Sequence, residues 1–219
     1  MSTKDHMNAS PPRRRVPRHC RPGLQWSTQA GKAFRGFTLL ELMVVLAIVA
    51  ILATLAVPSL TRLIQSNTIS SNVNTFMADM RYARSESIRR GGGVVMCRSD
   101  APEATLPVCN TTSGPGGNGW VSGWIVYLDA NNDGIIAAGN LLRVQSPLTR
   151  MDSIKEKDAH ASSLFRFTAT GRLFDVSSAT SLHFGGSAYA VDVQRVLCVN
   201  AGGHTRIAGD GAASCGADS

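Results

Sequence analysis

The sequence predicts an α+β protein in which one long amino-terminal helix packs on an antiparallel β domain of two small sheets. Three features of the 219-residue chain support this prediction. Residues 37–57 form an apolar run, residues 60–90 repeat apolar side chains at helical spacing, and residues 94–199 contain short β-rich runs separated by turns. The length allows one ordinary domain beside a membrane segment, with the helix covering one face of the sheets.

The apolar run, FTLLELMVVLAIVAILATLAV, has Glu41 as its only ionisable residue. At ~1.5 Å per residue it gives a helix of about 31 Å, which is enough to cross a bilayer. A lone carboxylate inside such a helix costs about 2.5–3.5 kcal/mol on insertion scales, so we expect Glu41 to be functional. A cut between Gly36 and Phe37 would place a new α-ammonium one helical turn from Glu41, or within reach of Glu41 in another subunit.

The formal net charge of +7 is concentrated before the apolar run. Residues 1–36 hold eight basic residues against Asp5 alone, whereas residues 37–219 hold 14 basic and 14 acidic residues. Lys and Arg beside an apolar span stay cytoplasmic, so everything after Pro58 is expected outside the cytoplasm. The charge therefore indicates topology rather than nucleic-acid binding. The alternatives are an ordinary signal anchor and a secretory signal peptide, for which the run is too long and its end, Ala-Val-Pro-Ser, is a weak cleavage site.

An amphipathic helix is predicted beyond Pro58, because apolar residues recur there every three or four positions. These residues are Leu60, Leu63, Ile64, Ile69, Val73, Phe76, Met77, Met80 and Ala83. Three glycines at residues 91–93 are expected to end the helix. Residues 1–35 are rich in Pro, Arg and Ser, lack apolar periodicity and are expected to be disordered.

Seven short runs after Val94 have the composition of strands. They are VVMCR, WIVYL, LLRV, LFRF, RLFDV, SLHF and VDVQRVLCV. Turn-rich stretches such as SGPGGNG and DANNDG separate them. This spacing indicates an antiparallel sheet, or two packed sheets, covered on one face by the helix.

Four cysteines follow the apolar run: Cys97, Cys109, Cys198 and Cys215. An even number in an oxidising compartment predicts two disulfides, for which three connectivities are open. Pairing neighbours in the sequence, Cys97 with Cys109 and Cys198 with Cys215, is the simplest of the three, and each loop would contribute roughly 3 kcal/mol. A zinc site is the alternative, but no CxxC pair or nearby histidine supports it.

The stretch RGFTLLE followed by an apolar run resembles the signature of type IV pilins and type II secretion pseudopilins, many of which also carry a helix-bending proline at the position of Pro58. The second half resembles the GspH/FimT branch of this superfamily. The matching pieces are Cys97-Arg98, Gly123 to Tyr127, the turn from Asp129 to Gly134, Leu142 to Val144, Phe167, Gly171-Arg172, Leu197 to Val199, Arg206 and Cys215. The resemblance covers nearly all of residues 36–215.

This resemblance implies a pilin-like fold with four parts. These are a cleaved leader at residues 1–36, a transmembrane and polymerisation helix at 37–58 with a kink at Pro58, its amphipathic continuation at 59–90, and an extracytoplasmic β domain at 91–219. A prepilin peptidase is expected to cut between Gly36 and Phe37 and to methylate Phe37. The resemblance further implies anchoring in a bacterial inner membrane with the domain in the periplasm, followed by entry into a filament.

As a minor pilin or pseudopilin, the chain is expected to initiate, prime or cap a type IV pilus or a type II secretion pseudopilus. Its expected partners are other minor and major pilins or pseudopilins, the peptidase and an inner-membrane assembly platform. Glu41 is expected to select register by meeting a neighbour's terminal ammonium inside the filament. The alternative, a local pairing of Glu41 with its own Phe37 amine, stays open.

A DNA receptor of the FimT type is the alternative function. Its family pattern Gly-Arg-x-Arg appears here as Gly203-His204-Thr205-Arg206, with a histidine in place of the first arginine. Candidate DNA-binding residues are Arg195, Arg206 and Arg172. The formal neutrality of residues 37–219 and the nearby Asp192, Asp210 and Asp218 argue against this function.

The turn after the second run is a weak candidate for calcium. Asp129, Asn131 and Asp133 occupy alternate positions, as the oxygen ligands of a calcium loop do, and Gly134 is at the sixth position of that loop. The twelfth position of the loop, where a bidentate acid is expected, is Asn140. This favours a polar hairpin connection. No other metal site, no cofactor and no catalytic activity are expected, because the sequence has no GxSxG, Walker or HExxH motif and its histidines are scattered.

Overall fold

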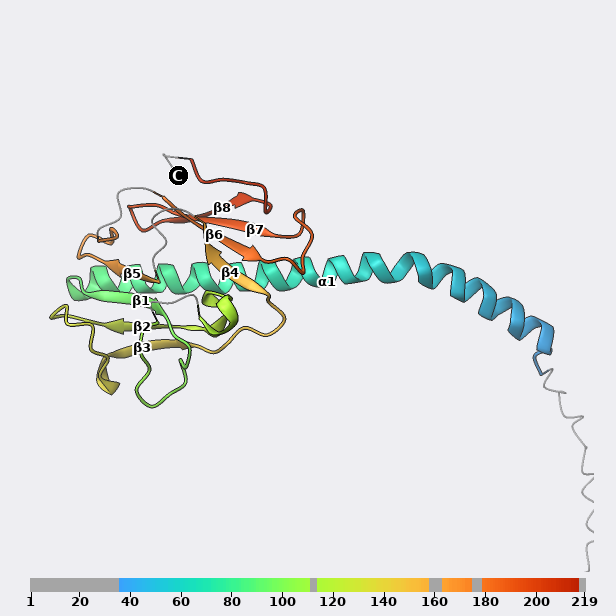
Figure 1. Cartoon of the computed structure of the whole chain (residues 1–219), viewed down its shortest axis with the longest axis horizontal. Helices are drawn as coiled ribbons and strands as arrows, with labels where there is room; N and C mark the ends of the chain where they lie inside the picture. The colour runs from blue at the N-terminus through green and yellow to red at the C-terminus, as the bar shows by residue number, and fades with distance from the viewer. Residues whose placement is uncertain (1–35, 111–113, 158–162, 175–178, 217–219) are drawn as a thin grey trace, which may run out of the picture. The chain divides into compact units, whose positions relative to one another are not determined.

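The computed structural model describes residues 36–110, 114–157, 163–174 and 179–216 (Figure 1). The chain divides into two units, residues 1–46 and 47–219, and the predicted disordered stretch at residues 1–35 lies outside the described residues. Helix α1 (Leu39–Arg90) precedes all the strands found in the described residues. These are β1 (Val94–Arg98), β2 (Trp124–Leu128), β3 (Leu141–Gln145), β4 (Ser153–Glu156), β5 (Leu164–Phe167), β6 (Thr180–Gly185), β7 (Arg195–Val199) and β8 (Thr205–Gly209).

The carboxy-terminal part of α1 is amphipathic, as the apolar repeat predicts. Its buried side chains are Ile69, Val73, Phe76, Met77, Met80 and Ala83. The helix ends at a glycine cap, because Gly91 has a φ of 80° and the Gly92 N–H donates to the Ser87 carbonyl oxygen at 2.8 Å. The three consecutive glycines therefore end the helix where the sequence predicts.

The strands form two four-stranded antiparallel sheets with α1 between them (Figure 1). Sheet A has the order β3-β2-β1-β5 and sheet B the order β4-β6-β7-β8. Every pair of neighbouring strands is antiparallel. The predicted α+β architecture, a long helix packed on two small antiparallel sheets, is confirmed.

Three details of the predicted strands are wrong. The run RLFDV forms no strand in its described residues, because Gly171 adopts a φ of 74° and folds the chain back so that Leu173 makes an isolated bridge with Phe167. The first half of VDVQRVLCV is a turn that precedes β7. Two edge strands of sheet B, β4 and β8, were not predicted, because the sequences SIKE and TRIAG each contain one large apolar residue and alternate weakly.

An aromatic cluster forms the centre of the core between the sheets. Phe76 of α1 meets Trp120, in the turn before β2, at 5.2 Å and Trp124 of β2 in sheet A at 5.1 Å between ring centroids. Its ring also contacts Phe165 of β5 and Phe184 of β6, which are 6.4 and 5.7 Å away. A single helical side chain therefore contacts both sheets, with the edge-to-face geometry that aromatic rings prefer.

Buried polar contacts join the layers. The Asp79 carboxylate on α1 accepts a hydrogen bond from the Trp124 indole at 2.8 Å and forms an ion pair with Arg143 at 2.8 Å. Burial raises the pKa of Asp79, while the indole hydrogen bond and the Arg143 charge oppose this shift. Between the sheets, Arg98 of β1 and Glu156 of β4 form a buried ion pair at 3.9 Å.

A disulfide-linked segment covers the outer face of each sheet. On sheet A, the Cys97–Cys109 disulfide holds the chain after β1 over a buried cluster that includes Val95 and Tyr127. On sheet B, Cys198 points away from the core-facing Leu197, is buried, and is bonded to Cys215. Both bonds join neighbours in the sequence. The two sheets thus share one construction, with α1 on the inner face and a tethered segment on the outer face.

Candidate functional site

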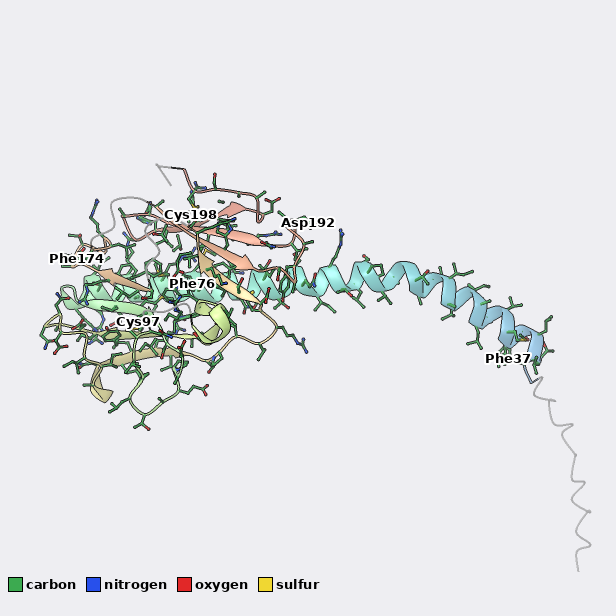
Figure 2. All side chains as sticks on the ribbon, viewed as in Figure 1. Phe37, Phe76, Cys97, Phe174, Asp192 and Cys198 are labelled. Atoms are coloured by element: carbon green, nitrogen blue, oxygen red, sulfur yellow. A yellow bond between two sulfur atoms is a disulfide. The ribbon has the colours of Figure 1, made fainter. Side chains whose placement is uncertain are left out.

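The predicted processing and assembly residues lie just before α1 and in its first turn. Gly36, Phe37 and Thr38 precede the helix, and the Phe37 side chain is 82% exposed (Figure 2). The Thr38 hydroxyl accepts a hydrogen bond from the Glu41 N–H at 3.2 Å, and the Thr38 carbonyl accepts one from the Leu42 N–H at 3.1 Å. The Gly36–Phe37 peptide bond therefore lies outside the helix, and Glu41 lies within its first turn.

Thr38 is a site residue that the sequence reasoning missed. Thr38 and Glu41 have the spacing of a capping box, S/T-x-x-E, in which the hydroxyl caps the free N–H groups of the first turn. The positive end of the helix dipole also favours an acidic side chain at this position. The pattern Thr-Leu-Leu-Glu therefore predicts that the helix starts after Thr38. Cleavage, methylation and the pairing of Glu41 stay predictions.

Apolar side chains on the amino-terminal part of α1 are exposed and are not covered by any described residue (Figure 2). In residues 36–46 the exposed side chains are Phe37, Leu39, Leu40, Leu42, Met43, Val44, Val45 and Leu46. In residues 47–64 they are Ile48, Val49, Ile51, Leu52, Val57, Leu60, Leu63 and Ile64. Among the described residues, α1 is the one helix long and apolar enough to cross a membrane. Apolar surface of this extent requires a bilayer or other helices around it.

Pro58 lies inside α1, which continues through it. Proline has no N–H, so the carbonyl oxygen of Thr54 loses its usual donor in the next turn. One backbone hydrogen bond of the helix is therefore missing within the apolar part of α1. The bend at Pro58 stays a prediction.

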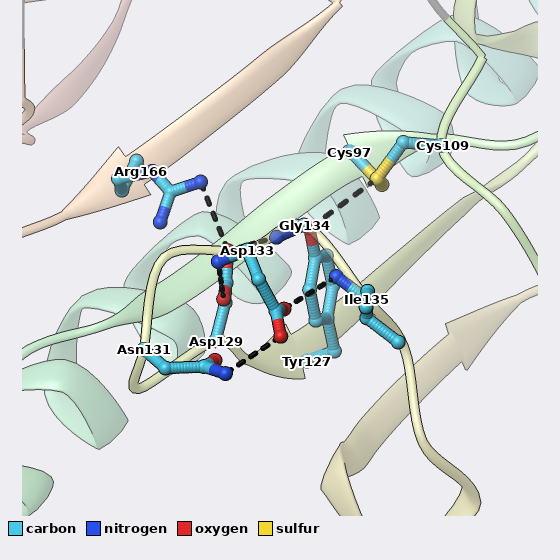
Figure 3. Close-up of polar contacts among 9 residues, drawn as sticks. All are labelled: Cys97, Cys109, Tyr127, Asp129, Asn131, Asp133, Gly134, Ile135 and Arg166. Carbon is cyan, nitrogen blue, oxygen red and sulfur yellow. Dashed lines mark hydrogen bonds and ion pairs between the residues drawn. A yellow bond between two sulfur atoms is a disulfide. The ribbon is translucent and has the colours of Figure 1, made fainter.

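The calcium candidate is a loop closed by its own side chains (Figure 3). The Asp129 carboxylate accepts hydrogen bonds from the backbone N–H groups of Asp133 and Gly134, at 3.1 and 3.2 Å. It also forms an ion pair with Arg166 of β5 at 2.9 Å. Asp133 in turn accepts hydrogen bonds from the Asn131 amide and the Ile135 N–H. A guanidinium therefore lies where a cation would approach Asp129, and the loop fits the polar hairpin connection.

Tyr127 lies beside this loop in sheet A. Its hydroxyl is 3.6 Å from the Cys109 sulfur (Figure 3). Burial raises the pKa of Tyr127, and the negative charge of Asp129 raises it further. The neutral phenol is therefore favoured, as suits a side chain under the disulfide-linked segment.

The three candidate DNA-binding arginines do not form one cluster. Arg195 begins β7, and its guanidinium donates to the carbonyl oxygens of residues 192–194, so it caps that turn. Arg206 of β8 pairs in register with Cys198 near the other end of β7. Arg172 lies in the turn that contacts the β7–β8 connection, since the Leu173 N–H donates to the Ala201 carbonyl. The structure brings Arg172 and Arg206 to the same end of sheet B and separates them from Arg195.

Comparisons with known proteins identify both halves of the chain. Residues 72–203, more than half of the chain, match the family described as type II transport protein GspH. Residues 31–57 match the prokaryotic N-terminal methylation motif. No curated protein matches the chain.

Two solved structures of the type IV minor pilin FimU from Pseudomonas aeruginosa (strain PAO1) resemble the chain. The crystal form in space group P21 has a TM-score of 0.47 and 21% identity, and the match covers 64% of this chain and 88% of the other. The form in space group P65 has a TM-score of 0.43 and 20% identity, and it covers 63% and 90%.

Proposed function

The chain belongs to the GspH family of pseudopilins, and from this premise we propose that it is a minor subunit that initiates or primes a type IV pilus or type II secretion pseudopilus, or lies at its tip. Proteins of this family are structural subunits and not enzymes, in agreement with the lack of a catalytic motif in the sequence. The methylation motif at residues 31–57 supports removal of the leader by a prepilin peptidase.

The observation that carries the proposal is the contrast between the two parts of α1. The large apolar side chains of α1 up to Ile64 are exposed, whereas most of those from Ile69 onward are buried in the β domain. The first part suits a bilayer before assembly and other helices after it. The two disulfides support a location of the domain in an oxidising compartment, which for this class of protein is the periplasm.

Glu41 supplies the proposed selection of register. Burying its charge among apolar helices is costly unless an opposite charge meets it, and the α-ammonium that cleavage creates at Phe37 is such a charge. In a packed filament, the ammonium of one subunit and the carboxylate of the next would then meet only at one axial offset. Other pilins or pseudopilins are thus the proposed partners of this helix.

Substitution of Glu41 tests the assembly role. Glu41→Ala should leave the chain cleaved and in the membrane but exclude it from sheared filaments, because the terminal ammonium has no partner. The measurement compares immunoblots of membrane and filament fractions. Leu42→Ala, which changes an exposed apolar neighbour, is the matched control and should still enter filaments. Normal incorporation of Glu41→Ala would show that Glu41 does not select register.

A further inference from the structure

A pocket of about 260 Å³ lies between α1 and the turn that joins β7 to β8. Helix α1 contributes Arg81, Arg84, Ser85 and Ile88 to its lining, and the turn contributes Gly203, His204 and Thr205. The two sides are more than 100 residues apart in the sequence. The turn side belongs to the pattern Gly203-His204-Thr205-Arg206, but no motif links it to the arginines of α1. It lies entirely within residues 47–219.

The lining carries positive charge that has no carboxylate to balance it. It contains two guanidinium groups and no acidic side chain. Within the described part of the chain, neither Arg81 nor Arg84 forms an ion pair, whereas Arg89 and Arg90 both pair with Glu86 at 2.6 Å. Two unneutralised cations beside a concave surface make a favourable potential for an anion.

Arg84 is fixed in place before any ligand arrives. Its Nε donates to the Gly171 carbonyl oxygen at 3.0 Å, and its stem packs between two glycines. A Cβ atom on Gly171 would lie 3.0 Å from Arg84, and one on Gly203 would lie 3.3 Å from it. Both glycines have a φ of 74°, which other residues rarely adopt. Among the described residues, no acceptor is bonded to the two terminal nitrogens of Arg84, which can therefore donate to a ligand.

The turn opposite the helix is also held by hydrogen bonds. The Asn200 side chain accepts from the His204 N–H at 3.0 Å, and the backbone of Asn200 exchanges further hydrogen bonds with His204 and Gly203. The Thr205 hydroxyl is shielded from solvent and has no hydrogen-bond partner among the described residues. A buried polar atom without a partner is costly unless a ligand or water satisfies it.

We propose that this pocket binds a phosphate group. A planar carboxylate is satisfied by one guanidinium in a two-pronged contact, whereas two guanidinium groups and an imidazole offer more donors, from two sides, as a tetrahedral oxyanion requires. The volume holds a phosphate and part of whatever carries it. The phosphate is either a free ion or a phosphodiester of nucleic acid, and the site differs from the arginine set predicted from the sequence because Arg81 and Arg84 come from α1. The inference does not depend on the role in filament assembly.

The test uses the full chain in detergent at constant ionic strength, titrated calorimetrically with inorganic phosphate and with acetate. Phosphate should bind and acetate should not. Arg81→Gln should weaken phosphate binding about tenfold, the effect expected for one charge-assisted contact. Arg89→Gln is the matched control, because it removes an exposed arginine from the same helix that is already paired with Glu86, and it should leave binding unchanged.

A second arm identifies the source of the phosphate. A fluorescent 20-nucleotide DNA strand is titrated with the same proteins by anisotropy, with inorganic phosphate as competitor. Binding of DNA that Arg81→Gln weakens and phosphate displaces supports a phosphodiester, whereas binding of inorganic phosphate alone supports a free ion. Absence of phosphate binding, equal binding of acetate, or equal effects of Arg81→Gln and Arg89→Gln would overturn the proposal.

Discussion

The carboxylate of Asp79 is a buried charge that holds α1 to sheet A, and it makes stability depend on pH. Because burial raises its pKa, the folded chain keeps the proton to higher pH than the unfolded chain does. The contribution of Asp79 to stability is therefore greatest at acid pH, and it falls as the pH rises from about 4 through the raised pKa.

Two substitutions of Asp79 separate its charge from its hydrogen bond. Asp79→Asn keeps an acceptor for the Trp124 indole, so its free energy of unfolding relative to the natural chain should rise between pH 4 and pH 7. Asp79→Ala leaves the indole N–H buried without a partner and should cost about 1–3 kcal/mol. Chemical denaturation of the full chain in detergent at several pH values measures both. A pH-independent difference for Asp79→Asn would contradict the raised pKa.

The sequence predicts the site residues that are adjacent in the chain, but not those that only folding brings together. Gly36, Phe37 and Glu41 follow from one short stretch, because cut site, carboxylate and apolar run are adjacent in the sequence. Arg81 and Arg84 could not be grouped from the sequence with the turn that completes their pocket, because that turn lies beyond residue 199. The closure of the Asp129 loop by Arg166 of β5 likewise depends on a pairing distant in sequence.

Among the elements, α1 depends on its aromatic contact with both sheets. Phe76→Ala should cost about 3–5 kcal/mol, because it removes a ring that contacts four other aromatic rings and leaves a cavity between the sheets. Phe174→Ala, at a side chain that is 53% exposed, should change stability by less than about 0.5 kcal/mol. Denaturation midpoints compare the two, and equal midpoints would show that the aromatic cluster does not hold the helix.

The disulfide-linked segments contribute stability at the outer faces of the sheets. Replacing Cys97 and Cys109 by serine should cost about 3 kcal/mol, because the bond closes a loop with a sequence separation of 12. Replacing Cys198 and Cys215, separated by 17, should cost a similar amount. Cys20→Ser leaves both bonds intact and is the control. Denaturation that is insensitive to either pair would show that other contacts hold these segments.

The elements themselves were predictable where the local pattern is strong. The apolar repeat from Ile69 and the three glycines identify the buried stripe and the end of α1, and the β-branched run at β1 identifies a fully buried strand. Strands β4 and β8 lie at the edges of sheet B and have few large apolar residues, so their partners, not their own sequences, decide their structure.

At the scale of the whole molecule, a priming subunit should control how often filaments begin. Deleting the chain should lower the number of filaments per cell while leaving their length and the membrane level of the major subunit unchanged. Electron microscopy and immunoblotting measure these quantities, and the natural chain should restore the number where Glu41→Ala does not. Filaments of normal number but altered length would contradict a role in initiation.

The placement of α1 between two sheets has a mechanical consequence. The helix contains no cysteine, and both disulfides join a strand to a segment outside the helix. During the proposed extraction from a bilayer, no disulfide therefore carries a pulling force from α1 into the domain. Besides the backbone that continues from α1 into β1, the force passes through noncovalent contacts such as the rings around Phe76 and the hydrogen bonds of Asp79, Arg84 and Ser87. The force that draws the helix out of the domain should therefore fall in Phe76→Ala and stay the same under reducing agents.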